Sequence, residues 1–275
     1  MIMKMYKKQN LHTHSTFCDG RDTPEEMIDT ALERGFDSLG FSMHSYVKYS
    51  SVERVNPEKI AAYCKEIAGL KEKYKGIIDI FLGLEYDFYS DYTHDGYDYL
   101  IGSVHYLDTP DGPKSFDTGL AAVLEYIKKY YPDSTLRFAR DYYRKLAELP
   151  KRGKIDIIGH FDLITKNNEI GKFLDTDSAD YKRYALEAVH ALKGKIEVFE
   201  VNTGAIARGY RTLPYPSSDI LRELKKCGFY PTISSDCHNR DFIDCHFDSA
   251  RELLRSAGFS SQVVLTATGF CEVGI

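Results

Sequence analysis

The sequence has no long apolar run and no cluster of basic residues. No stretch approaches the roughly 20 apolar residues of a membrane-spanning helix, and no apolar segment follows the opening MIMKMYKKQN to make a secretory signal. A net charge of −5 without a basic tract disfavours a nucleic-acid surface, because phosphate backbones are held by clustered Lys and Arg. We therefore expect a cytoplasmic protein with a small-molecule substrate and neither a nucleic-acid nor a membrane partner.

Paired cysteines and linker segments are also missing. The six cysteines lie far apart without a CxxC pair, and a 275-residue chain that is 43% hydrophobic can enclose a core without disulfides. We expect six free thiols. Since no repeat, low-complexity tract or Pro/Gly/Ser-rich linker interrupts the chain, we expect a single domain over residues 1–275. The sequence leaves the oligomeric state open.

What the sequence contains is an alternation of short β-prone runs with longer helical stretches, which is typical of a parallel sheet with helices outside it. Thr23 as the N-cap and Pro24 at the first helical position predict the start of the first helix, and Gly35 predicts its end. Other helical stretches are expected at 57–74, 120–149, 179–192, 217–227 and 248–257. The first strand is expected to end at about residues 11–13. Six further strands are expected at 37–42, 77–85, 99–104, 154–159, 196–202 and 229–235. A last strand is expected at 262–267, and its position in the sheet is left open. The segment 87–114 is partly loop. This order predicts a (β/α) barrel of about seven strands.

Histidines and carboxylates fall at the ends of these strands. Because the carboxyl ends of parallel barrel strands meet on one face, we expect these side chains to share a pocket. Imidazole nitrogens and carboxylate oxygens are ligands of Zn, Mn and Fe(II), and a carboxylate such as Glu85 can bridge two ions. The predicted metal ligands are His12, His14, Asp19, His44, Glu85, His105, His160, Asp236 and His238.

Local spacing supports this interpretation. His12 and His14 are two residues apart, as are Asp236 and His238, so each pair points the same way from an extended segment. One such pair is weak evidence in a chain with nine histidines, but six of the nine lie at predicted strand ends. The remaining three are expected to be structural: His94, His190 and His246. The side chains of Cys18 and Cys237 are expected to point away from the neighbouring ligands.

The stretches LHTHSTFCDG, FSMHS, LGLEYDF, YLIGSVH, IIGHFD, FEVNTGAIARGYR and SSDCHN occur in this order and resemble the polymerase-and-histidinol-phosphatase (PHP) superfamily, most closely its histidinol-phosphate phosphatases. The resemblance runs from His12 to His238. It implies a distorted (β/α)7 barrel with three divalent ions. The implied ligands are His12, His14, Glu85 and Asp236 for the first ion; Glu85, His105 and His160 for the second; and Asp19, His44 and His238 for the third.

The resemblance further implies hydrolysis of L-histidinol phosphate by metal-activated hydroxide, with Asp236, His238 and Glu85 as catalytic residues. No CX5R, GxSxG or GK[ST] motif suggests covalent catalysis or nucleotide binding. Bidentate contact with phosphate suits Arg208 or Arg211. Glu200 and Asn202 share a strand face, and they could hold the substrate's amino group or, equally, form buried hydrogen bonds within the barrel. Either Asp162 or His238 could protonate the leaving alkoxide.

Three alternatives remain open at this point. One is a phosphoesterase of the same superfamily that acts on nucleotides or other small esters. Another is an amidohydrolase, although those usually lack the Glu on strand three, and many need a carbamylated Lys on strand four that this chain does not offer. The third is a metal-dependent binding module without catalysis.

Overall fold

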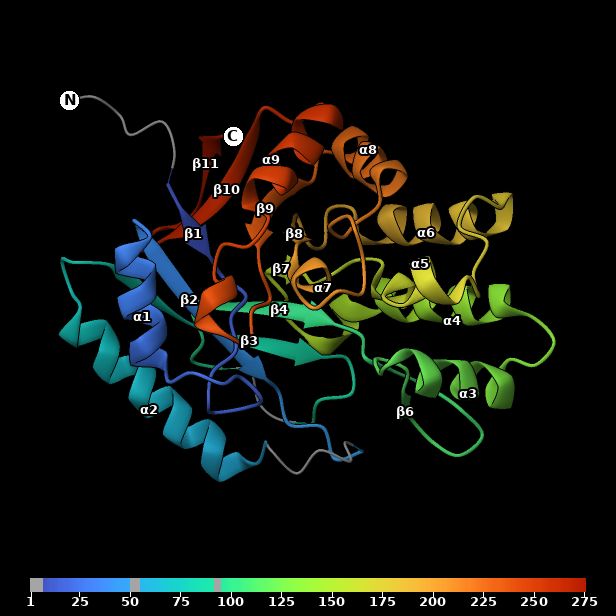
Figure 1. Ribbon diagram of the computed structural model, residues 1–275, viewed down its shortest axis with the longest axis horizontal. Coiled ribbons are helices and arrows are strands. Elements are labelled where there is room, and N and C mark those ends of the chain that lie inside the picture. The colour runs from blue at the N-terminus through green and yellow to red at the C-terminus, as the bar shows by residue number, and fades with distance from the viewer. Residues whose placement is uncertain (1–6, 50–54, 92–94) are drawn as a thin grey trace.

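Seven parallel strands form the centre of the molecule (Figure 1). The computed structural model describes residues 7–49, 55–91 and 95–275. Each strand pairs with its successor, so the order in the sheet follows the order in the chain. The strands are β1 (Gln9–Asn10), β2 (Ser38–His44), β3 (Asp79–Asp87), β4 (Tyr99–Ser103), β7 (Ile157–Ile158), β8 (Val198–Asn202) and β9 (Tyr230–Ser234).

The first and last strands of this sheet meet and nearly close it into a barrel. A bridge joins Thr13 to Cys237, and the amide of His14 donates to the carbonyl of Cys237 at 2.9 Å. Below this bridge, the Asn10 side chain donates to Ser235 Oγ at 2.6 Å. The predicted (β/α)7 barrel is therefore confirmed, with the β1–β9 junction held partly by side chains.

Helices cover the outside of the barrel (Figure 1). At the start of the first one, Thr23 accepts from the amide of Glu26 and the Glu26 carboxylate accepts from the amide of Thr23, which is the capping box expected from the sequence. The larger helices are α1 (Pro24–Glu33), α2 (Pro57–Lys73), α3 (Leu120–Tyr130), α4 (Thr135–Ala147), α6 (Ala179–Leu192), α8 (Ser218–Cys227) and α9 (Phe247–Ser256).

The stretch 120–149, expected to be helical throughout, is divided. Helix α3 ends at Tyr130 and α4 begins at Thr135, with Pro132 between them. Proline lacks an amide hydrogen and disfavours the helical conformation in the residue before it, so the helix breaks there. Short elements complete the chain: β5 (Tyr106–Leu107), β6 (Lys114–Ser115), α5 (Asn168–Gly171), α7 (Gly204–Ala207) and 3-10 turns at Leu149–Arg152, Leu163–Thr165 and Arg240–Phe242.

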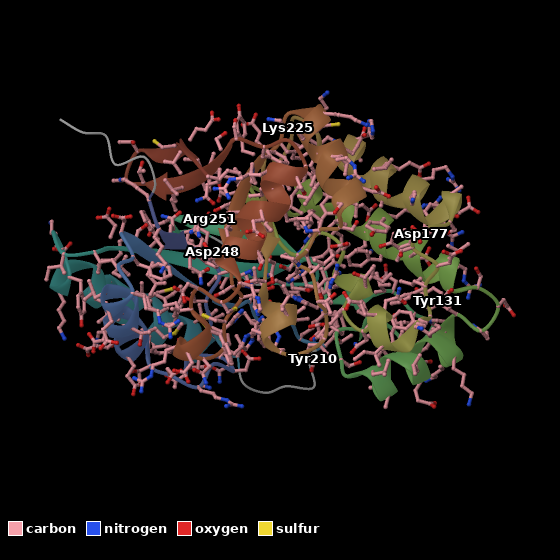
Figure 2. All side chains as sticks on the ribbon, turned by 45° about the horizontal axis from the view of Figure 1, so that its top comes forward. Tyr131, Asp177, Tyr210, Lys225, Asp248 and Arg251 are labelled. Carbon is pink, nitrogen blue, oxygen red and sulfur yellow. The ribbon has the colours of Figure 1, made fainter. Side chains whose placement is uncertain are left out.

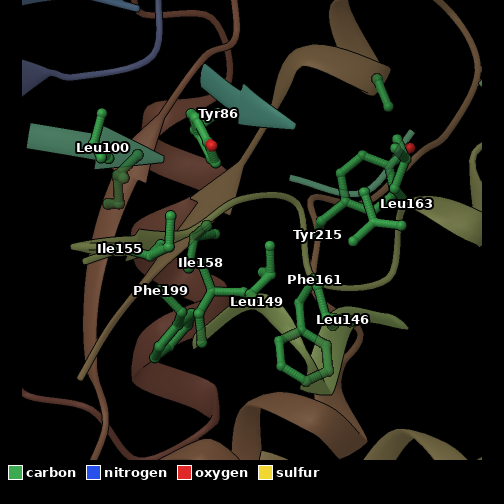
Figure 3. Packing of buried hydrophobic residues seen from close by; sticks show 14 of the residues in the cluster. Tyr86, Leu100, Leu146, Leu149, Ile155, Ile158, Phe161, Leu163, Phe199 and Tyr215 are labelled. Atoms are coloured by element: carbon green, nitrogen blue, oxygen red, sulfur yellow. The ribbon is translucent and has the colours of Figure 1, made fainter. Parts of the chain in front are cut away.

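The main hydrophobic core lies between the barrel and its helices. Figure 3 shows Ile158 and Phe199, from neighbouring strands, among Leu146, Leu149 and Phe161. All five side chains are fully buried. This layer fixes the strands from outside, and so fixes the direction of the residues that face inward.

A second cluster fills the barrel interior at the amino ends of the strands. The hairpin of β10 (Ser261–Thr266) and β11 (Gly269–Gly274) closes this end with Val263 and Leu265. Gln9 holds the hairpin, because its side chain accepts from the amide of Leu265 at 2.7 Å and donates to its carbonyl at 2.9 Å. The predicted strand at 262–267 therefore seals one end of the barrel and leaves the other end for polar side chains.

Polar and charged groups spread over the outside of the helical layer (Figure 2), as at the exposed Asp177, Lys225 and Asp248. Among the residues with described positions, no helix is both long enough and apolar enough to span a bilayer. All six cysteines are free, as predicted.

Tyr99 fills the barrel interior and generates a stability prediction. Its hydroxyl donates to the carbonyls of Leu11 and Phe41. Gly83 makes room for the ring, since a Cβ there would lie 2.2 Å from Tyr99 Cζ. We expect Gly83→Ala to lower the free energy of unfolding by roughly 1–3 kcal/mol, because an anchored ring cannot move aside. Urea unfolding of the metal-free protein measures this.

Gly69→Ala is the matched control. Gly69 is exposed in α2 and a Cβ there would meet nothing within 4 Å. We expect this variant to be more stable by roughly 0.5–1 kcal/mol, because alanine favours the helix. An equal response of the two variants would contradict the packing argument.

Candidate metal centre

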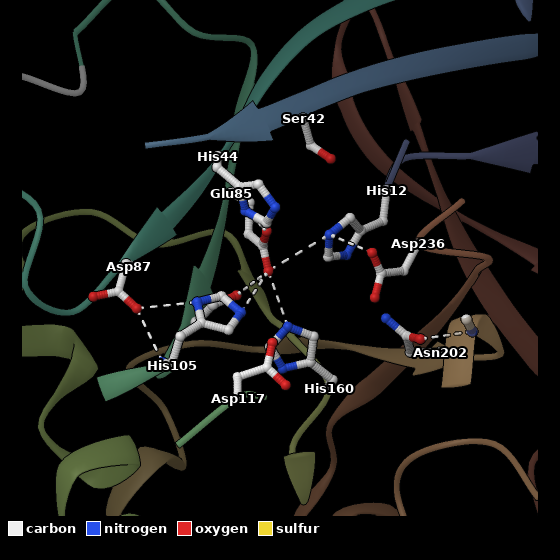
Figure 4. A network of polar contacts seen from close by, with 12 residues as sticks. His12, Ser42, His44, Glu85, Asp87, His105, Asp117, His160, Asn202 and Asp236 are labelled. Atoms are coloured by element: carbon white, nitrogen blue, oxygen red, sulfur yellow. Dashed lines mark hydrogen bonds and ion pairs between the residues drawn. The ribbon is translucent and has the colours of Figure 1, made fainter. Parts of the chain in front are cut away.

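The polar ends of the barrel strands converge on the carboxylate of Glu85. Glu85 is the seventh of nine residues in β3 and is buried. Its two oxygens lie 2.6–3.7 Å from ring nitrogens of five histidines: His12, His14, His44, His105 and His160. Figure 4 shows four of them, His12, His44, His105 and His160, around Glu85. These histidines come from four other strand ends, as the sequence predicted.

All nine predicted ligands fall into three groups, and within each group the donor atoms lie within 4.8 Å of one another. His14 belongs to two of these groups, which the sequence did not indicate. The groups are His12, His14 and Asp236; Glu85, His105 and His160; and His14, Asp19, His44 and His238.

Unpartnered buried atoms show that these residues fit divalent ions. Within the part of the chain that the structure describes, Nε2 of His12 and of His14, Oε2 of Glu85 and Oδ1 of Asp19 are buried without a hydrogen bond. Leaving such groups unpaired costs free energy, so most buried polar atoms in proteins have partners. Here nitrogen and oxygen lone pairs face one another, which a cation between them would satisfy.

Special backbone positions aim these side chains. Asp236 has φ 47°, in the left-handed region that residues other than glycine rarely adopt and that is often found at functional sites. Gly204 allows the α7 turn to approach it, since a Cβ there would lie 2.7 Å from the Ser235 carbonyl oxygen. Gly20 likewise lets the loop that carries Asp19 fold against the backbone of His14.

Two further carboxylates orient histidines from outside the cluster. The ring Nδ1 of His12 lies 2.9 Å from Glu200, and that of His105 lies 3.0 Å from Asp87. Such contacts fix the tautomer and orientation of a metal-ligating imidazole. Asp87 was not predicted, although its position two residues after Glu85 on the same strand was a usable signal.

The structure gives Glu200 and Asn202 other contacts than the expected substrate amine. Glu200 also accepts from the amide of His160 at 2.6 Å, from Asn202 Nδ2 at 2.9 Å and from Ser234 Oγ at 2.6 Å. The side-chain Oδ1 of Asn202 accepts from the amide of Gly204 at 2.9 Å. Both side chains are fully buried and their hydrogen bonds go to protein groups, so they support the barrel face beneath the cluster.

The two arginines that follow α7, Arg208 and Arg211, point to different sites. Arg208 reaches the cluster, where its Nη2 lies 3.0 Å from Asp236 Oδ2 and its Nη1 lies 3.1 Å from His238 Nδ1. The side chain of Arg211 is buried and points away from the cluster, to Asp162 at 3.9 Å and to Thr165, and it lines a separate cavity of about 670 Å³. The structure therefore places Arg208 at the cluster and Arg211 away from it.

An ion pair near the cluster was not predicted from the sequence. Lys166 Nζ lies 2.7 Å from Asp117 Oδ1, and Asp117 lines the pocket of about 190 Å³ that Glu85 and His105 also line. The two residues are 49 positions apart on separate loops, so no local pattern links them. Tyr215, whose buried hydroxyl has no hydrogen bond, packs 6.4 Å from the His160 ring and was also missed.

Cys18 departs from expectation, because its Sγ contacts His14 Nδ1 at 3.4 Å instead of pointing away. Among the other histidines, His190 is exposed and pairs with Glu223 at 2.9 Å, and His246 precedes α9 with φ 55°. These two lie outside the cluster, as expected. His94 lies outside the described residues.

Opposite charges offset the burial of the cluster. Burial lowers the pKa of His105, but the carboxylates of Glu85 and Asp87 raise it to about 10. Carboxylate neighbours likewise outweigh burial and raise the pKa of His12 and of His44 well above the usual value. Burial and the nearby His238 and His44 lower the pKa of His14 to about 3. Without metal, three of these rings therefore hold protons at neutral pH while His14 does not.

A seven-stranded parallel barrel with nine clustered histidines and carboxylates at the carboxyl ends of its strands defines a class of metal-site barrels. The sequence matches the PHP domain family over residues 10–204, and the chain belongs to that family.

The chain is similar over most of its length to known proteins. It is 29% identical to a Deinococcus radiodurans protein named probable histidinol-phosphatase, covering 90% of this chain and 92% of that protein. It is 26% identical to the histidinol-phosphatase of Bacillus subtilis, covering 90% of this chain and 99% of that protein. The histidinol phosphate phosphatase of Lactococcus lactis, solved with zinc, L-histidinol and phosphate, superposes with a TM-score of 0.71 at 21% identity, covering 96% and 99%. This last likeness shows the shared fold.

Metal binding at pH 7 should release protons. The raised pKa values mean that His12, His44 and His105 are protonated without metal, and a metal ligand must be deprotonated. The number of protons released should fall as the pH rises towards about 10, where His105 loses its own proton. Titration calorimetry in buffers of different ionisation enthalpy measures the release. A heat that does not depend on the buffer would contradict it.

Replacing Glu200 with glutamine should weaken metal binding. The side-chain amide nitrogen of the new glutamine cannot accept the hydrogen bonds that a Glu200 oxygen accepts now, so the His12 ring would lose its orientation. We expect affinity to fall roughly 10- to 100-fold, measured by competition with a chelator. Glu187→Gln, on the exposed face of α6, is the control. Unchanged metal affinity with a raised KM would instead support the other expected role, in which Glu200 binds substrate.

Proposed function

We propose that this chain hydrolyses L-histidinol phosphate to L-histidinol and phosphate. The observation that carries the proposal is the convergence of five histidines on Glu85, beside Asp236 and the guanidinium of Arg208. Membership of the PHP family and the similarity to histidinol-phosphatases over about 90% of the chain support the choice of substrate. The complex of the Lactococcus lactis protein with zinc, L-histidinol and phosphate supports it further.

We propose that three divalent ions, zinc, manganese or iron, occupy the centre. The donor groups support the assignment of His12, His14, Glu85 and Asp236 to the first ion, Glu85, His105 and His160 to the second, and Asp19, His44 and His238 to the third. When bound, such ions lower the pKa of a water towards neutrality and offset the charge of phosphoryl oxygens.

The chain's own residues then hold the substrate in place. Arg208 is about one-third exposed, so its guanidinium can donate to a phosphoryl oxygen while it still contacts Asp236. Burial of Glu85 and Asp236 keeps water away from the inner side of the cluster. Of the two groups considered as proton donors to the leaving alkoxide, His238 lies at the partly exposed rim, whereas Asp162 is buried against Ser217 and Arg211. Because a metal ligand must be deprotonated, His238 can act as this donor only when it does not hold the third ion.

Steady-state kinetics on the metal-loaded protein test the proposal. We expect kcat/KM for L-histidinol phosphate to exceed that for AMP and p-nitrophenyl phosphate by at least about 100-fold, because a site that pairs buried polar groups with its substrate rejects analogues that lack them. Asp236→Asn should abolish release from all three esters and so excludes a contaminating phosphatase. A preference for AMP would establish the nucleotide-directed alternative instead.

A further inference from the structure

The proposed substrate needs a partner for its ammonium group. In L-histidinol phosphate the ammonium is on the carbon next to the esterified CH₂, so it must lie close to the metal cluster when the phosphate is bound. A cation placed beside divalent ions is repelled unless a carboxylate faces it. Glu200 and Asn202 cannot serve, because their hydrogen bonds go to protein groups.

Resting on the proposed function, we propose that Asp117 determines substrate specificity by receiving this ammonium. Asp117 lines the same pocket as Glu85 and His105. Figure 4 shows its carboxylate beside the rings of His105 and His160, whereas Asp236 lies nearer to His12. The phosphate contact of Arg208 and the amine contact of Asp117 would thus engage two ends of one small substrate.

The backbone ties Asp117 to the metal cluster. The amide of Phe116 donates to the carbonyl of His105 at 3.2 Å, and the amide of Asp117 donates to Ser115 Oγ at 3.2 Å. On the other side, Asn167 Nδ2 donates to the carbonyl of Thr118 at 2.9 Å. Because these contacts lie on both sides of Asp117 in the chain, its carboxylate has a fixed position relative to a proposed metal ligand.

One carboxylate oxygen of Asp117 is available to accept a hydrogen bond from a ligand, unlike those of the other carboxylates that line this pocket. Its Oδ1 accepts from Lys166, and within the described part of the chain Oδ2 has no hydrogen bond, with the side chain one-quarter exposed. Asp87 is engaged through both oxygens, by Tyr89 and by His105. The two remaining lining carboxylates, Asp19 and Glu85, face the clustered histidines.

The ion pair with Lys166 stabilises the charged form of the Asp117 carboxylate. The Lys166 side chain is only 14% exposed, and its ammonium lies 4.9 Å from the Tyr210 ring centroid and pairs with Oδ1 of Asp117. The pairing keeps Asp117 ionised beside the histidines. It also raises a rival role, in which Asp117 serves only to position Lys166 for the phosphate.

The test compares two substrates that differ only in the amine: L-histidinol phosphate and 3-(imidazol-4-yl)propyl phosphate. We expect Asp117→Asn to lower kcat/KM for the first by roughly 10- to 100-fold, mainly through KM, because it removes a charged hydrogen bond. Activity on the amine-free ester should stay within about twofold of wild type, which also shows that the variant is folded and metal-loaded. Binding of the product L-histidinol, measured by calorimetry, should weaken in parallel.

Asp108→Asn is the matched control, since Asp108 lies between β5 and β6 but pairs with Lys145 at 2.7 Å outside the pocket. It should leave both substrates unchanged. Lys166→Met separates the two roles of the pair: the enzyme should keep its preference for the amine-bearing ester in this variant and lose it in Asp117→Asn.

Equal losses on both esters in the Asp117 and Lys166 variants would show that the pair acts on the phosphate, and would overturn the assignment of Asp117. So would an Asp117→Asn enzyme with an unchanged preference. A wild-type enzyme that hydrolyses neither ester would overturn the proposed function itself, which is a separate outcome.

Discussion

The structure depends on a buried carboxylate that is surrounded by imidazoles. Burial alone raises the pKa of Glu85, yet the positive rings of His105, His44 and His12 hold it well below the usual value. Charge removed from water is tolerated only when it is paired and hydrogen-bonded, so each of these histidines must be held at a fixed place. The barrel supplies those places, because it brings the ends of successive strands together around one axis.

Further groups hold the rings in turn. Glu200 and Asp87 fix two of the imidazoles, and Ser103 Oγ donates to Glu85 at 3.0 Å. The strands that carry these side chains pack against a buried hydrophobic layer. The cluster is therefore pre-organised for cations, and its carboxylates and histidines compensate one another when protons occupy it instead.

Most of the fold and the nine residues of the cluster could be predicted from the sequence, because the signals are local. A strand end, a two-residue spacing such as His12 and His14, and a capping sequence such as Thr23-Pro24-Glu25-Glu26 are properties of short segments. The direction of a side chain beyond the strand end is not local. Arg208 and Arg211 lie in one turn, yet the first faces the cluster and the second faces Asp162.

The same limit explains the other differences. The pairing of Asp117 with Lys166 arises from two loops that meet only in the folded barrel. Glu200 and Asn202 were correctly placed on one inward strand face, but their depth below the pocket depends on how the neighbouring strands are staggered. The break at Pro132 is different, because proline chemistry in the sequence already disfavours a helix there.

The closing contacts of the barrel have a consequence for how the protein forms. Asn10 contacts Ser235 across 225 positions and Gln9 contacts Leu265 across 256. Contacts between such distant segments cost the most loop entropy and form slowly. His12 lies directly above Asn10, so it meets Asp236 only once this junction has formed. During synthesis, the amino-terminal histidines would therefore reach their partner ligands only after nearly the whole chain has been made. Metal binding would then be one of the last steps of folding.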